Sequence, residues 1–370
     1  MKKHISMLLI LLMTFAFAGD KVVFEKSLKV KSGGVLKIDL ETGGDLNIST
    51  WGEMNISVTA KASEWNNKNK LEIEFSKSGR GAILESFSGK HLTYYISLPR
   101  KFNLDLLSMS GDFKISDLEG TIKGRTNGGS MVLNNLKGQI SMTTMGGSIS
   151  LKNSTLEGSV STMGGRVHME NVSGGVKGSS MGGEVIRKNV EGSGGKMTGG
   201  LVDISTMGGS INVDDAPEGA DVHTMGGEIH IKRAKKFVKA KTMGGNITID
   251  EVEGWVKATT MGGEIKVTMV GKGKKGAGDI ELTSMHGDIT LVIPKEYSMS
   301  FNLEVINHKN SSDQGKIVSD FDLGIEKEAE WQGNVRKGYK KSIFCKGKVG
   351  SGKNMITIKT HNSDIIIKQK

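Results

Sequence analysis

The sequence predicts an all-β protein: a parallel β-solenoid of about ten 18-residue coils with β caps at both ends. Apolar and polar residues alternate in short runs, as on strands with one buried face. The phrase Thr/Ser-Met-Gly-Gly recurs at an 18-residue interval, and a fixed period is typical of stacked arrays. A propeller blade needs about 40 residues. A transmembrane barrel needs longer strands and aromatic girdles, so the solenoid is favoured.

Residues 1–18 have the pattern of a secretory signal peptide. Lys2 and Lys3 precede an apolar stretch over residues 5–17, and a small-x-small cleavage site ends at Ala18. The apolar stretch is shorter than the roughly 20 residues of a spanning helix, and no cysteine directly follows the cleavage site to carry a lipid anchor. We therefore expect an exported chain without a transmembrane segment, located in the periplasm, at the cell surface or outside the cell.

Composition sets further bounds on the 370-residue chain. Fifty-two glycines, three prolines and 5% aromatic residues are unusual, but the strict alternation argues against glycine-rich disorder. The formal net charge falls from +10 to about +8 once Lys2 and Lys3 are removed, which weakly favours polyanionic partners. Cys345 is the single cysteine and cannot form an internal disulfide. A partly buried, inert thiol is favoured over pairing between chains.

The repeat is best followed from the methionine that heads each copy. Inserts of eight residues after Met181 and six residues after Met261 interrupt the 18-residue interval, and we expect both in loops. Looser copies are headed by Met109, Asn127 and Met285. The regular heads are Met145, Met163, Met181, Met207, Met225, Met243 and Met261.

The columns of the repeat predict which side chains face inward. Residues four and six places after each head are mostly apolar, such as Ile149 and Leu151, although Arg187 also stands in this set. The Thr or Ser before each head is expected to form a ladder of hydroxyls beside the turn. The methionines themselves are expected to point inward and fill an irregular corner. Thioether ligation of copper(I) is the less favoured alternative.

The ends of the chain lack the regular repeat. We assign residues 19–103 to an N-terminal β cap region, 104–293 to the solenoid and 294–370 to a C-terminal β cap, because open terminal coils would expose unpaired strand edges. The last segment has the form of a degenerate coil. Its expected inward residues are Ile356, Ile358, Ile365 and Ile367.

Several of these phrases resemble a known bacterial family. "SMSGDFKI" at residues 108–115 and "SMHGDITL" at residues 284–291 keep the pattern of the putative-adhesin β-strand-repeat family, a domain of unknown function. The middle coils depart from that pattern by placing glycine at both central positions and methionine before them. The resemblance implies an exported β-solenoid, with adhesion as a label attached to the family.

The sequence predicts no catalytic, cofactor-binding or metal-binding residues. A glycosidase needs two carboxylates across a cleft, but Glu184, Glu228 and Glu264 are spread along one outward column. His168 and His230 are three heads apart, and no histidine pair has metal-ligand spacing. We therefore expect a protein that is not an enzyme and that uses no cofactor.

A basic corner is the most suggestive local feature. We interpret it as a site for an anionic glycan, a lipopolysaccharide headgroup or an acidic protein, although Asp250, Glu251 and Glu253 would dilute its charge. A solvated loop that discourages edge aggregation is the favoured alternative. The export signal and the lack of interleaved aromatics argue against nucleic acid. The corner comprises Lys232, Arg233, Lys235, Lys236, Lys272, Lys274 and Lys275.

Together these features predict a non-enzymatic exported protein of the envelope or surface, an adhesin or a structural solenoid with a binding face. A periplasmic protein-partner or signalling module is one alternative. A polysaccharide-active β-helix enzyme is the other. The sequence leaves the ligand, the oligomeric state and the handedness of the coil open.

Overall fold

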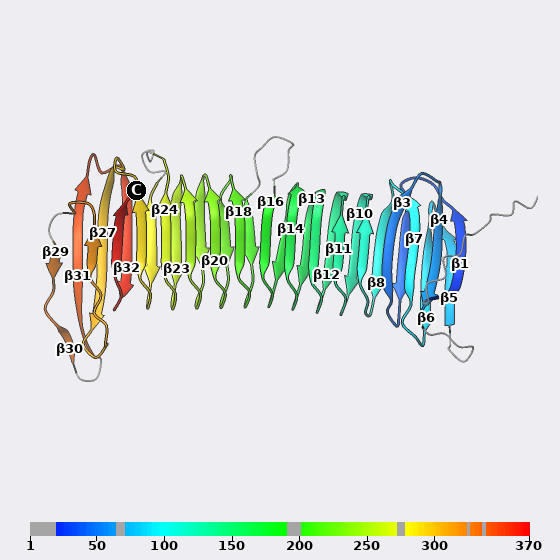
Figure 1. Ribbon diagram of the computed structural model, residues 1–370, viewed down its shortest axis with the longest axis horizontal. Coiled ribbons are helices and arrows are strands. Elements are labelled where there is room, and N and C mark those ends of the chain that lie inside the picture. Colours follow the sequence, from blue (N-terminus) through cyan, green and yellow to red (C-terminus); the bar gives the residue numbers. More distant parts are fainter. Residues whose placement is uncertain (1–19, 64–70, 191–200, 272–277, 324–325, 335–337) are drawn as a thin grey trace, which may run out of the picture.

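A computed structural model describes residues 20–63, 71–190, 201–271, 278–323, 326–334 and 338–370. Every regular element among those residues is a β-strand. The strands stack side by side into a long rod (Figure 1), which confirms the predicted parallel β-solenoid.

Each regular coil contributes one strand before its methionine and one strand after it. Ile229 lies opposite Ile247, and Val238 lies opposite Val256, so the parallel register is the 18-residue repeat itself. The strands before the heads are β8 (Asn103–Ser108), β10 (Glu119–Thr126), β12 (Lys137–Thr144), β15 (Val176–Ser180), β17 (Val202–Ser205), β19 (Ala220–His223), β21 (Phe237–Lys241), β23 (Trp255–Thr260) and β25 (Ile280–Ser284). Those after the heads are β9 (Phe113–Ser116), β11 (Met131–Asn134), β13 (Ile149–Thr162), β14 (Val167–Ser173), β16 (Val185–Val190), β18 (Ile211–Ala216), β20 (Ile229–Ala234), β22 (Ile247–Val252), β24 (Ile265–Met269) and β26 (Ile289–Ile293). The second half of β13 also serves as the strand before Met163.

The apolar columns line the inside of the rod as predicted. Residues four and six places after each head, such as Ile229 and Ile231, are buried. Arg187 is also buried, and in register it lies between Met169 and Val213 of the neighbouring coils. Burial lowers the pKa of Arg187 to about 10, so the guanidinium remains charged at neutral pH.

At the N-terminal end, the parallel stack extends into the region assigned to the cap. The coil formed by β2 and β3 lies between the coil of β6 and β7 and the coil of β8 and β9. Antiparallel pairs of β1 with β4, β4 with β7 and β5 with β6 complete this end. The strands are β1 (Lys21–Lys29), β2 (Val35–Leu40), β3 (Asp45–Trp51), β4 (Asn55–Ala62), β5 (Leu71–Ser78), β6 (Gly81–Ser88) and β7 (Thr93–Pro99).

At the C-terminal end, the chain passes beyond the stack and then returns to it. β32 pairs in parallel with β25 on one side and β27 on the other, while β31 pairs antiparallel with β27. The predicted last coil is confirmed, because Ile356, Ile358, Ile365 and Ile367 are all buried. Cys345 is buried too, with its Sγ 3.7 Å from the Leu323 carbonyl. These strands are β27 (Met299–His308), β28 (Ile317–Ser319), β29 (Glu326–Glu328), β30 (Gln332–Asn334), β31 (Gly338–Val349), β32 (Asn354–His361) and β33 (Ile365–Gln369).

The bend at Thr-Met-Gly-Gly differs from the prediction. Thr224 and Gly227 are buried, whereas Met225 is 43% exposed and Gly226 faces solvent with it. Two consecutive residues therefore point outward, and the alternation of side chains changes phase after the threonine. The prediction that the methionines fill the interior corner is wrong.

Hydrogen bonding explains why threonine takes the inner position. The Thr224 hydroxyl donates to the Gly209 carbonyl at 2.9 Å and accepts from the Gly227 N–H at 3.2 Å. A methionine in that position would leave both buried backbone groups without these partners. The predicted hydroxyl ladder is thereby confirmed. The same bond to a glycine carbonyl of the preceding coil is made at 2.7–2.9 Å by Thr144, Thr162, Ser180, Thr242, Thr260 and Ser284.

The two glycines of the bend have different roles. A Cβ added to Gly227 would lie 2.1 Å from the Gly209 carbonyl oxygen, which is far inside contact distance. A Cβ added to Gly226 would meet nothing closer than 3.7 Å. Close stacking of the coils therefore requires glycine only at the second position.

This difference gives a matched test of the bend. We expect Gly227→Ala to destabilise the protein by about 1–3 kcal/mol, because the added methyl group forces neighbouring coils apart. Gly226→Ala should stay within about 0.5 kcal/mol of wild type, since it adds a methyl group in open space. Thermal unfolding followed by circular dichroism measures both. Equal losses in the two variants would contradict the stacking explanation.

Candidate binding site

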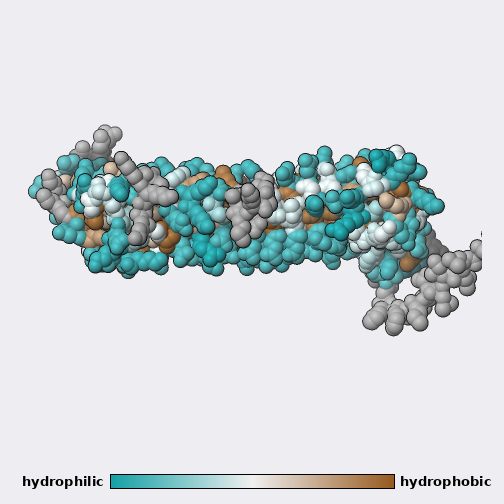
Figure 2. Space-filling view, turned by 90° about the horizontal axis from the view of Figure 1, so that it is seen from above, coloured by the Kyte–Doolittle hydropathy of each residue, from teal (hydrophilic) through white to brown (hydrophobic). Residues whose placement is uncertain are grey.

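Charged side chains on the outside of the rod pair along its axis. Arg233 donates two hydrogen bonds to Asp215 of the preceding coil at 2.6 and 2.7 Å. Lys239 reaches Asp221 at 2.9 Å in the same way. Exposed pairs of this kind contribute little stability individually. Their main effect is to neutralise charge from one coil to the next, and the side seen in Figure 2 is largely hydrophilic with only small apolar patches.

The predicted basic corner contains several such pairs. Lys232 and Arg233 lie at the end of β20, and Lys235 and Lys236 form the turn to β21; all four are exposed. Arg233 lowers the pKa of Asp215, Lys232 is 3.5 Å from Asp214, and Lys236 pairs with Glu218. Carboxylates of the preceding coil therefore offset much of the positive charge. Lys272, Lys274 and Lys275 lie outside the described residues. Polyanion binding at this corner stays a prediction.

A groove of about 530 Å³ opens beside the basic corner. It crosses β23, β25 and β32, at the point where three coils present equivalent positions to solvent. Phe237, which follows Lys236 directly, lies opposite Trp255 at the edge of this groove. The groove is lined by the exposed Trp255, Lys257, Asp279, Glu281 and Met355 and by the half-buried Thr357.

An aromatic stack forms one wall of the groove. The rings of Phe237 and Trp255 are parallel within 7°, with centroids 4.7 Å apart. Gly219 supports this stack from the coil before, because a Cβ there would lie 2.4 Å from the Phe237 ring. The indole is 37% exposed, and its column continues into the groove through Asp279 and Met355. Trp255 is thus a fixed apolar surface beside polar groups.

Paired polar groups line the rest of the groove. Asp279 accepts the Met355 N–H at 2.8 Å, and Lys257 contacts Glu281 at 2.9 Å. Burial and the Asp279 carboxylate raise the pKa of Tyr297 to about 12, so its phenol stays neutral and donates to the Gly278 carbonyl at 2.8 Å. An apolar wall facing hydrogen-bonding groups suits a ligand with one apolar face and many hydroxyls.

Comparison with known proteins defines the family. The sequence profile of the family described as Toastrack DUF4097 matches residues 27–368. This chain belongs to the Toastrack family. The assignment confirms the resemblance inferred from the coil phrases to a domain of unknown function.

Other comparisons add little to this Toastrack assignment. A solved structure of a putative cell adhesion protein from Clostridium sporogenes is 12% identical, with 95% of this chain and 100% of that chain covered. Its TM-score of 0.18 is too low for the likeness to bear on fold or function. None of the curated proteins matches the chain.

The groove residues were not predicted from the sequence. The aromatic pair could have been predicted, because Phe237 and Trp255 are 18 residues apart and therefore in one column. The position of Met355 and Thr357 beside β25 could not be predicted from the repeat, because their coil returns to the stack only after residues 299–349. The carboxylates Glu184 and Glu228 line a separate hollow with His230.

The histidines of this Toastrack chain are mostly surface residues. His168 and His230 each contact a carboxylate, Glu170 at 3.2 Å and Asp250 at 2.8 Å. In the parts of the chain that the structure describes, no three His, Cys, Asp or Glu side chains are placed to share a metal ion. Nor does any helix long and apolar enough to cross a membrane occur there.

One histidine pair in the C-terminal cap is partly buried. The rings of His308 and His361 stack with centroids 5.7 Å apart, and Nε2 of the first lies 3.4 Å from Nδ1 of the second. Burial, followed by the neighbouring His308, lowers the pKa of His361. Lys359 and His286 act in the same direction, and Glu304 opposes them.

This lowered pKa predicts how stability depends on pH. The unfolded chain protonates His361 near pH 6.5, so its contribution is present above that pH and is lost as pH falls through the lower folded pKa. We expect the melting temperature to fall less between pH 7 and pH 5 in His361→Asn than in wild type. His230→Asn, at an exposed site, is the control and should follow wild type. If the melting temperatures of wild type and His361→Asn fall equally with pH, the pH dependence does not come from His361.

Proposed function

We propose that this Toastrack protein is an exported, non-enzymatic component of the bacterial envelope or surface that binds glycan chains. The aromatic wall at Trp255 carries the proposal. A sugar ring packs its apolar C–H face on an indole and exchanges hydrogen bonds through its hydroxyls. Lys257, Glu281 and Thr357 supply such partners in the same groove.

The state of the carboxylates favours binding over catalysis. Hydrolysis of a glycoside requires one carboxyl group as a proton donor and a second as base or nucleophile. Glu281 is held by Lys257, and Asp279 accepts a backbone N–H. Both carboxylates are arranged to hold the groove in shape, and the polysaccharide-active enzyme is the less favoured alternative.

The neighbouring basic corner would extend the binding site for an anionic glycan. Lys236 directly precedes the aromatic residue Phe237, so a chain lying across the indole would pass these cations. Exposed cations attract polyanions through an interaction that salt screens. A charged glycan should therefore bind more tightly at low salt than a neutral glycan of the same length.

The indole gives the direct test of glycan binding. On an array of bacterial and host glycans, we expect Trp255→Ala to weaken binding about tenfold to a hundredfold, as for other buried aromatic anchors. Trp331→Ala is the matched control, because Trp331 is also 37% exposed but lies on the C-terminal cap. We expect a second variant to lose only the salt-dependent part of glycan binding. It replaces Lys235, Lys236, Lys272, Lys274 and Lys275 by Ala. If the wild-type protein binds no glycan on the array, or if both tryptophan variants lose binding equally, glycan binding in the groove is refuted.

Export is tested by the processing of residues 1–18. In a bacterial host, we expect a C-terminally tagged chain to leave the cytoplasm and to begin at Gly19 when its mass is measured. Leu11→Asp places a charge within the apolar stretch and should block cleavage. Asp20→Asn lies beyond the cleavage site and should not. A full-length, cytoplasmic wild-type chain would contradict the proposal.

A further inference from the structure

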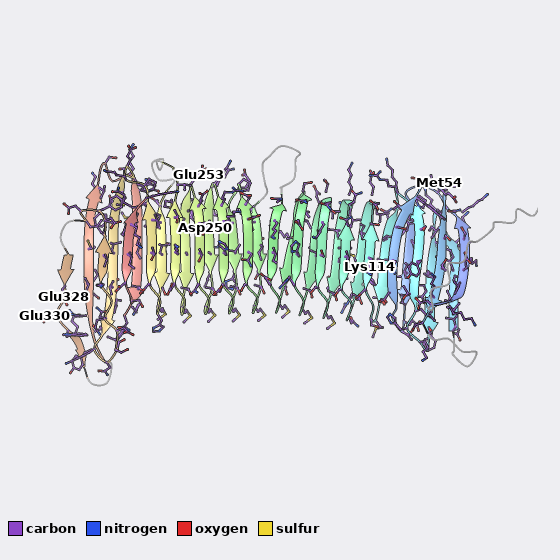
Figure 3. All side chains as sticks on the ribbon, viewed as in Figure 1. Met54, Lys114, Asp250, Glu253, Glu328 and Glu330 are labelled. Atoms are coloured by element: carbon purple, nitrogen blue, oxygen red, sulfur yellow. The ribbon has the colours of Figure 1, made fainter. Side chains whose placement is uncertain are left out.

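An unbroken row of methionines runs along one edge of the rod. Eight successive coils place their head methionine outward, and each side chain is between 38% and 50% exposed. Figure 3 shows a row of sulfur atoms along the lower edge of the rod, whereas Glu253 lies at the upper edge. We call this row the methionine ladder. Its members are Met145, Met163, Met181, Met207, Met225, Met243, Met261 and Met285.

Packing does not account for the methionine ladder. The inner corner of each bend is occupied by a hydroxyl, and the methionines lie outside it, each between 38% and 50% exposed. Simple copying of the repeat does not account for it either, because the outward column three places further on, whose residues are exposed or half-buried, varies in residue type from coil to coil. That column reads Ser148, Arg166, Glu184, Ser210, Glu228, Asn246, Glu264 and Asp288. At the head position, by contrast, all eight coils have a methionine.

The rungs of the ladder are in direct succession. The Gly226 N–H donates to the Met207 carbonyl at 3.0 Å, and the same bond joins Gly244 to Met225 at 3.1 Å. The bond also crosses the eight-residue insert, where Gly208 donates to Met181 at 2.9 Å. Neighbouring methionines are therefore one strand spacing apart, about 4.8 Å.

Side chains of adjacent rungs can meet at the sulfur. Upstream of the ladder, Asn127 occupies the head position of its coil, one coil beyond Met109. Its Nδ2 lies 3.7 Å from the Met109 Sδ. A polar atom at one head position thus already contacts the thioether at the head of the preceding coil.

Spacing and ligand type together point to a soft metal ion. Thioethers select copper(I), whereas harder ions prefer carboxylate, imidazole or water. The bond from zinc to a cysteine thiolate is about 2.3 Å long. With that length as a guide for copper(I), an ion held in line between two sulfurs spans about 4.6 Å. That span matches the strand spacing of about 4.8 Å, and the flexible methionine side chain adjusts the remainder.

We propose that the methionine ladder binds copper(I), or silver(I) with the same chemistry, between the thioethers of neighbouring coils. Each ion takes two adjacent rungs, so eight rungs hold about four ions. The geometry requires adjacency, since the backbones of rungs two coils apart are separated by about 9.6 Å. This binding is independent of the groove at Trp255, which lies at the other edge of the same strands.

Two variants with the same number of methionines test adjacency. Met163, Met207, Met243 and Met285 replaced by Leu leave four rungs with no neighbours. Met225, Met243, Met261 and Met285 replaced by Leu leave four rungs in succession. The probes are copper(I), titrated without oxygen against a chromogenic chelator, and silver(I), counted by native mass spectrometry.

We expect about four ions in wild type, about two in the contiguous variant and none held tightly in the alternating variant. Replacing the exposed Met54 by Leu should leave the count unchanged. Circular dichroism compares the folding of the two ladder variants, which carry equal numbers of leucines. No binding by wild type at micromolar concentrations, or equal loss in both ladder variants, would overturn the proposal.

Discussion

The hydroxyl at each bend fixes the arrangement of the whole rod. It donates to a glycine carbonyl of the preceding coil and accepts from a glycine N–H of its own coil, as at Thr224. One side chain therefore joins neighbouring coils and closes the turn. Because it must point inward, the next two residues point outward, and the phase of every following column is set. Gly227 allows the contact, since any Cβ there would meet the carbonyl below it.

Stacking at a constant register turns each surface position into a line of equivalent residues. In the first half of the solenoid, one corner column carries asparagines in the left-handed conformation, and Asn171 donates to Asn153 at 3.1 Å. In the second half, the same column carries Asp215 and Arg233 as an ion pair. The aromatic stack and the methionine ladder follow the same rule, because like groups repeat at one strand spacing.

The sequence predicted what is periodic and missed what depends on geometry within a turn. The 18-residue interval gave the register, and alternation gave the buried columns. Orientation of the methionines failed because hydropathy does not register the hydrogen-bonding needs of a bend, which Thr224 meets. The coil order at the ends, where β2 lies between β6 and β8, carries no repeat to reveal it. By contrast, the carboxylates that offset the charge of the basic corner could have been predicted from the sequence, since Asp215 precedes Arg233 by one 18-residue repeat.

The two proposed ligands would occupy opposite ends of the same strands. Trp255 begins β23 and Met261 follows its end, so six residues of extended chain, about 20 Å, separate the groove from the ladder. A glycan lying in the groove would leave the thioethers open to solvent. The two edges also respond differently to the length of the solenoid. The groove depends on three particular coils, whereas each added pair of coils adds one metal-binding position to the ladder. Duplication of an 18-residue coil therefore extends the ladder and leaves the groove unchanged.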